Sequence, residues 1–84
     1  MILDPAARQE MAAWRSDAVR TIIRSLARRG IEHAAVNEMV RRYREGEGLK
    51  EIAVAIGAPW PAVHEALFDL RRAGIALPKP KREG

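Results

Sequence analysis

The sequence predicts an all-α protein, with a long N-terminal amphipathic helix, a group of three short helices and an extended basic tail. Apolar residues recur at steps of three and four along most of the chain. Glycines mark the points where these patterns stop, and no segment alternates convincingly as a strand does. We therefore expect a helix in residues 1–30, a three-helix domain in residues 31–77 and a basic flexible tail in residues 78–84.

The first helix is predicted from its start signals and its apolar stripe. Asp4 can cap it, and Pro5 suits the first helical position, where no N–H is needed. Gly30 is a natural stop. The stripe crosses Ser16 and Asp17 without losing its period, so it fits either one continuous helix or two helices broken near these residues. Its members recur at steps of four and three: Ala7, Met11, Trp14, Ala18, Ile22 and Leu26.

The length of this helix predicts a homodimer. At roughly 1.5 Å per residue, 25 helical residues span about 38 Å, which is more than the short helices that follow can cover. Part of the apolar stripe is therefore expected to meet a second copy of the chain. The predicted dimer interface consists of Met11, Trp14, Ala18, Ile22 and Leu26.

Three short helices follow, each with one apolar face. The first places Val36, Met39, Val40 and Tyr43 at positions i, i+3, i+4 and i+7. The glycines of "GEG" end it, and a second helix follows in residues 49–56. The third helix repeats the same spacing and ends at Gly74. Its inward residues are Val63, Ala66, Leu67 and Leu70.

Composition and charge limit the possible functions. The 84 residues are 48% apolar and include no cysteine, which excludes a disulfide scaffold and favours a reducing cytoplasm. No apolar run approaches the roughly 20 residues of a membrane span, and no signal peptide is expected. The net charge is +4, with +3 in residues 1–30, −1 in residues 31–72 and +2 in residues 73–84. A polyanion is a plausible partner, attracted mainly by the two ends of the chain.

Catalysis and metal binding are not expected. The aliphatic hydroxyls are confined to Ser16, Thr21 and Ser25, and no acid–base pair accompanies a nucleophile. His33 and His64 each lack a second ligand at metal spacing. We therefore expect a protein that is not an enzyme and that carries no metal and no other cofactor.

Residues 34–77 resemble the helix-turn-helix DNA-binding domain of resolvases and DNA invertases, and also small actinobacterial helix-turn-helix regulators. The resemblance is carried by Ala53, Gly57 and Val63, and by the flanking stretches "VRRYREGEGLKEIA" and "VHEALFDLRRAGI". A small residue lets the two helices approach, and a glycine can adopt the positive φ of the corner. The resemblance implies a bacterial, cytoplasmic or nucleoid-associated transcription regulator or architectural factor that binds double-stranded DNA as a dimer. Its two motifs would lie about 34 to 36 Å apart.

The residues that the family pattern turns toward the DNA groove are unusual here. Bases are read mainly by Arg, Lys, Asn, Gln, Ser and Thr, whereas only His64 and Glu65 can form hydrogen bonds on this face. The two prolines of "PWP" favour a regular helix that begins only at Pro61, with Trp60 as the entry residue. The residues that the resemblance places at the groove, besides Pro59, are Trp60, Pro61, His64, Glu65 and Phe68.

Two hypotheses follow for this face. Either it reads DNA by shape and apolar contact, or Trp60, Phe68, Glu65 and Asp69 form a protein-binding surface of an adaptor. Trp60 also fits packing at the edge of the core. Phosphate contacts are expected from two further groups: Arg41, Arg42, Arg44 and Lys50, and in the tail Lys79, Lys81 and Arg82.

Each group has an alternative. The three arginines could instead pair with Glu38, Glu45 and Glu47, and the tail could be a minor-groove arm or simply a solvated terminus.

Overall fold

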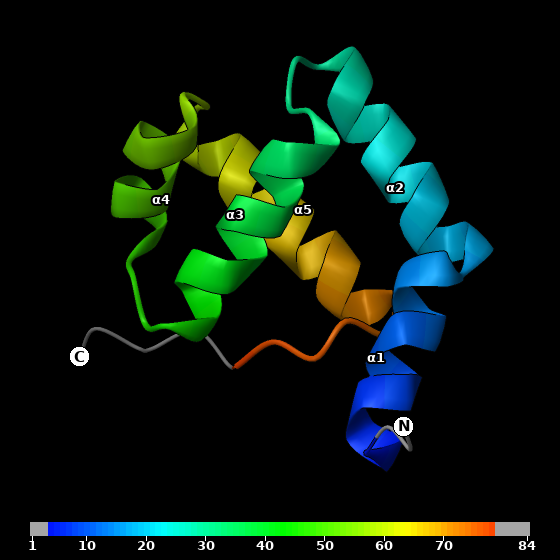
Figure 1. The fold of residues 1–84 in the computed structure, drawn as a ribbon. Helices are drawn as coiled ribbons and strands as arrows, with labels where there is room; N and C mark the ends of the chain where they lie inside the picture. The colour runs from blue at the N-terminus through cyan, green and yellow to red at the C-terminus, as the bar shows by residue number, and fades with distance from the viewer. Residues whose placement is uncertain (1–3, 79–84) are drawn as a thin grey trace.

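The computed structural model of the protein describes residues 4–78, which form five α-helices and no strand (Figure 1). This confirms the prediction of an all-α fold. No helix within the described residues combines the length and the apolar character needed to cross a bilayer. The helices are α1 (Pro5–Arg15), α2 (Asp17–Arg28), α3 (His33–Arg44), α4 (Leu49–Ile56) and α5 (Trp60–Arg72).

The N-terminal region consists of two helices and not of one long helix, which is the second of the two alternatives that the sequence left open. Ser16 has an extended backbone (φ −65°, ψ 151°) and separates α1 from α2. Its hydroxyl donates a hydrogen bond of 2.7 Å to the carbonyl oxygen of Ala13 and accepts one of 3.3 Å from the N–H of Val19. One serine thus caps both helices, because its side chain competes with the backbone for local hydrogen bonds. The break is at Ser16, one of the two residues, Ser16 and Asp17, near which the sequence analysis considered a break.

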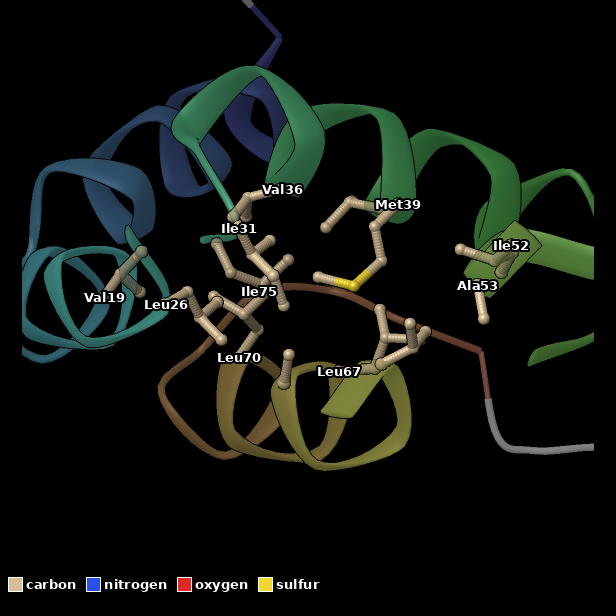
Figure 2. Close-up of a cluster of buried hydrophobic side chains, with 13 residues drawn as sticks. Val19, Leu26, Ile31, Val36, Met39, Ile52, Ala53, Leu67, Leu70 and Ile75 are labelled. Carbon is tan, nitrogen blue, oxygen red and sulfur yellow. The ribbon is translucent and has the colours of Figure 1, made fainter. Parts of the chain in front are cut away.

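The hydrophobic core lies between α2, α3, α4 and α5 (Figure 2). Met39, Ile52 and Leu70 are among its largest fully buried side chains, and they come from three different helices. The described residues of α1 contribute none of the buried side chains, although Ala13 and Trp14 pack against the core. The predicted inward faces of α3 and α5 are confirmed, with Tyr43 partly buried and the other residues buried: Val36, Met39, Val40, Val63, Ala66, Leu67 and Leu70.

The corner between α4 and α5 is made by Gly57, Ala58 and Pro59. Gly57 adopts a left-handed conformation (φ 72°, ψ 35°), as the sequence predicts for this position. Its N–H donates to the carbonyl of Val54 at 3.3 Å, and the N–H of Ala58 donates to the carbonyl of Ala53 at 3.0 Å. These two bonds satisfy two of the last four carbonyls of α4, those of Ala53 and Val54, at the point where the chain turns.

The helix α5 begins one residue earlier than predicted. Pro59 is extended (ψ 141°) and its carbonyl accepts hydrogen bonds from the N–H groups of Ala62 and Val63, at 3.1 and 3.2 Å. Pro59 is therefore the entry residue, and Trp60 already belongs to the first turn. Pro61 disturbs nothing there, because an N–H in the first turn has no partner inside the helix.

Arg44 joins three distant parts of the chain. Its guanidinium forms an ion pair with Glu10 of α1, and its Nε donates a hydrogen bond of 3.1 Å to the carbonyl oxygen of Ala76. The segment after α5, in orange in Figure 1, accordingly runs past the end of α3. Ile75 of this segment is buried in the core. The C-terminal segment is thus held on the helices by Ile75, Ala76 and the partly buried Leu77.

Candidate nucleic-acid interface

One face of α5 holds the helix to the core, and the opposite face is open to solvent. The buried residues Val63, Ala66, Leu67 and Leu70 lie within an arc of about 100° of the helix circumference. We call the opposite side the outer face of α5. Its residues, which are all exposed, are Pro61, His64, Glu65, Phe68 and Arg72. The structure therefore brings together the α5 residues that the sequence analysis assigned to the site, with Trp60 at their N-terminal end.

Two large apolar side chains are exposed on this helix. Trp60 has 50% and Phe68 has 54% of its surface open to solvent. The other half of the Trp60 surface is covered, so packing at the edge of the core stays an alternative for this residue. The guanidinium carbon of Arg72 lies 5.7 Å from the centroid of the Phe68 ring. Such a cation–π contact is worth about 0.5–1 kcal/mol at an exposed site.

The N-terminus of α5 offers little to a phosphate group. Pro59 and Pro61 have no N–H, and the N–H groups of Ala62 and Val63 donate to the carbonyl of Pro59. Within residues 4–78, only the N–H of Trp60 remains without a partner in this first turn. The helix-terminus mode of anion binding is therefore weak here.

Cations lie at the C-terminal end of this surface and on α4. Arg71 and Arg72 lie in the last turn of α5, and Lys50 lies in the first turn of α4. No carboxylate of the described residues pairs with any of these three side chains within 4.0 Å. Arg71 also lines a small hollow of about 50 Å³ together with His64 and Phe68.

The arginines of α3 have a different environment. Arg41 pairs with Glu38 and Glu45, whereas the Nε of Arg42 donates to Glu38 at 2.7 Å and its Nη1 donates to Glu47 at 2.9 Å. Hydrogen bonds from Arg42, and then from Arg41, hold the pKa of Glu38 below its ordinary value of 4.5. Of the two interpretations open from the sequence, the paired surface is the one found. A phosphate would have to displace a carboxylate to reach either arginine.

The remaining predicted phosphate contacts do not add to the outer face of α5. Arg44 is occupied by Glu10 and the carbonyl of Ala76. Lys79, Lys81 and Arg82 lie outside the described residues. The cations on or against α5 are therefore Arg71 and Arg72 in its last turn, and Arg29 of α2, whose guanidinium lies 3.7 Å from the carboxylate of Glu65.

The sequence analysis did not assign Arg71 and Arg72 to the site. A signal for Arg72 was present, because it follows Phe68 by four residues and so continues the series of Pro61, His64, Glu65 and Phe68 along one side of the helix.

The residues predicted for a dimer interface are divided between the core and the surface. Leu26 is buried in the core of its own chain, and Trp14 and Ile22 pack partly against it. Met11 is 42% exposed, and Ala18 is also exposed. The break at Ser16 explains this distribution, because it lets α2 pack on α5.

Comparisons of the chain with known protein families, with curated proteins and with solved structures found no match. The likeness to the helix-turn-helix of resolvases and invertases therefore rests on the residues of the segment 34–77. Among the described residues, no group of three His, Asp or Glu side chains is arranged to hold a metal ion.

Proposed function

We propose that the protein binds double-stranded DNA through the outer face of α5, as a bacterial transcription regulator or architectural factor. One observation carries the proposal: α5 is fixed to the core along its length, and its opposite side is a continuous exposed surface next to the Gly57 corner. A helix of about 10–12 Å diameter fits a major groove about 12 Å wide.

The side chains on this surface support reading by shape and apolar contact. We expect Phe68 and Trp60 to approach thymine methyl groups, while His64, Glu65 and Arg72 are the hydrogen-bonding groups of the face. Arg71, Arg72 and Lys50 then supply phosphate contacts at its margins. With few groups that can discriminate bases, we expect modest sequence selectivity and strong dependence on salt.

Dimerisation is part of the proposal and depends on a small exposed surface. Met11 and Ala18 are the predicted interface residues that remain accessible in a single chain. A dimer would place two copies of α5 about 34–36 Å apart on one side of the DNA. Sedimentation at tens of micromolar protein tests dimerisation separately. A monomer under these conditions would contradict the dimer but not the proposed binding of DNA.

A second candidate function is supported by the exposed aromatic residues. Trp60 and Phe68 are types of residue enriched in protein interfaces, and the cations nearest to α5 are few. In this alternative the outer face of α5, which includes Glu65 and has Asp69 at its margin, docks a protein partner.

Binding to a mixed-sequence duplex distinguishes the two candidates. In fluorescence anisotropy at about 50 and 200 mM salt, contacts to several phosphates predict that affinity falls by about tenfold or more. If the protein shows no binding to the duplex even at the lower salt concentration, DNA binding is contradicted and the protein-binding function is favoured.

A further inference from the structure

A groove of about 320 Å³ lies where α1 meets α2, well separated in sequence from α5. Its lining residues are Trp14, Arg15, Arg20, Ile23, Arg24 and His33. Three of the six are arginines, and no carboxylate of the described residues lies within 4.0 Å of their charged nitrogens. They differ in this respect from Arg41 and Arg42 of α3, which are neutralised by glutamates.

The break at Ser16 creates this arrangement. On a straight helix, Arg15 and Arg24 would lie nine residues and therefore about 180° apart, on opposite sides. Because α1 ends at Arg15 and α2 starts in a new direction at Asp17, side chains from both helices line the same groove. The cluster is therefore a product of the fold.

The lining defines the chemistry of a ligand. Arginine presents a planar fork of N–H donors that matches a phosphoryl group. His33 is the first residue of α3, and no side chain caps the N-terminus of that helix, so the positive end of its dipole also borders the groove. Trp14 and Ile23 provide the apolar part, and an indole ring is a good surface for stacking a base.

We propose that this groove binds a nucleoside phosphate, with its phosphoryl groups at Arg15, Arg20 and Arg24 and its base against Trp14. The volume lies within the range of small-molecule sites. The ligand is a free nucleotide or a nucleotide within a nucleic-acid strand, since both present the same phosphate and base. The site is separate from α5, so it does not depend on the proposed DNA-binding function.

The fluorescence of Trp14 can be used to detect binding of a ligand in the groove. The chain has two tryptophans, so in a Trp60→Phe variant the intrinsic tryptophan fluorescence comes from Trp14 alone. Titration with adenosine diphosphate is expected to quench this fluorescence to saturation at submillimolar concentrations. Adenosine, which lacks the phosphates, is expected to bind at least about tenfold more weakly. A quench that does not saturate, or equal affinity for adenosine, would overturn the proposal.

Substitutions separate the groove from general electrostatic attraction. Arg20→Ala and Arg24→Ala, made in the Trp60→Phe background, are each expected to weaken binding by about fivefold or more, and Arg24→Lys by less. Arg28→Ala is the matched control, because it removes the same charge from an exposed position of α2 that does not line the groove. An equal loss in Arg28→Ala would mean that only net charge matters, and would contradict the proposal.

Two further measurements identify the source of the nucleotide and separate the groove from α5. If a short single-stranded oligonucleotide displaces adenosine diphosphate and binds more tightly than it does, the ligand is a nucleic-acid strand. If the oligonucleotide binds more weakly than adenosine diphosphate, the ligand is a free nucleotide. The double variant Arg71→Ala/Arg72→Ala is expected to keep its affinity for the diphosphate even where it loses duplex DNA. Loss of the diphosphate in that variant would contradict a separate site.

Discussion

The guanidinium carbon of Arg72 lies 5.7 Å from the centroid of the Phe68 ring on the solvent side of α5. The two residues are one helical turn apart, so the contact needs no other element to hold it. It positions a cation in the last turn of α5, where the helix dipole also favours positive charge. The outer face of α5 thus carries an apolar centre with a positive charge already fixed beside it.

Removal of both arginines at the end of α5 is expected to weaken DNA binding and its salt dependence. If Arg71 and Arg72 each neutralise one phosphate, the double variant Arg71→Ala/Arg72→Ala lowers the slope of log affinity against log salt by about 2. The measurement is anisotropy with a fluorescent duplex over a range of salt concentrations. The matched control is Arg41→Ala/Arg42→Ala, which removes the same charge from residues already paired with glutamates.

We expect a clearly smaller change of slope in that control. If the two double variants changed the slope equally, the distinction between paired and unpaired arginines would be wrong.

Truncation of the exposed aromatic residues is expected to alter binding without altering the fold. Trp60 and Phe68 are half exposed, so Trp60→Ala and Phe68→Ala should change the free energy of unfolding by no more than about 0.5–1 kcal/mol. For a surface that contacts bases, both variants lose duplex affinity, as measured by anisotropy. Loss of a protein partner in a pull-down with duplex affinity unchanged would instead favour the protein-binding candidate.

The glutamate shared by Arg41 and Arg42 makes stability sensitive to acid. The pKa of Glu38 in the folded protein is below its ordinary value of 4.5, so the ionised form is favoured by folding. Its contribution is fully present above about pH 4.5 and is lost as the pH falls through the lower folded pKa. We expect wild-type protein to lose more stability than Glu38→Gln between pH 6 and pH 3 in thermal unfolding followed by circular dichroism. Parallel losses in the two proteins would argue against the ion pairs.

The corner between α4 and α5 depends on the conformation of Gly57. An alanine would find no atom within 4 Å of its Cβ, so the cost of Gly57→Ala comes from the positive φ alone. We expect a loss of about 1–2 kcal/mol in the free energy of unfolding measured with urea. Gly57→Asn is the matched comparison and should lose less, because asparagine tolerates the left-handed region better. An alanine variant as stable as wild type would show that the corner does not require this conformation.

The buried faces could be predicted from the sequence because helical periodicity reports burial directly. Val63 and Leu70 are seven residues apart on one side of α5, and both are fully buried. The break at Ser16 could not be decided in this way, because the apolar stripe keeps its steps of four across it. The helix is interrupted at Ser16, because the serine hydroxyl forms hydrogen bonds with the backbone of both helices.

The site was predicted in part for a similar reason. The resemblance to the helix-turn-helix family gave positions 61, 64, 65 and 68 as groove-facing, and these positions share a face in any α-helix. Whether Arg41 and Arg42 face phosphates or glutamates depends on side-chain positions, which spacing does not determine. The groove around Trp14 was missed because its arginines come together only when the N-terminal region bends.

The central claim is that the outer face of α5 contacts DNA, and amide chemical shifts in nitrogen-15 NMR spectra test it most directly. On addition of an unlabelled duplex at low salt, we predict the largest shift changes at Trp60 and residues 64–72 of α5, with smaller changes near Lys50. Changes confined to α1 and α2, with the amides of α5 unmoved, would contradict the account and place the nucleic acid at the groove around Trp14 instead.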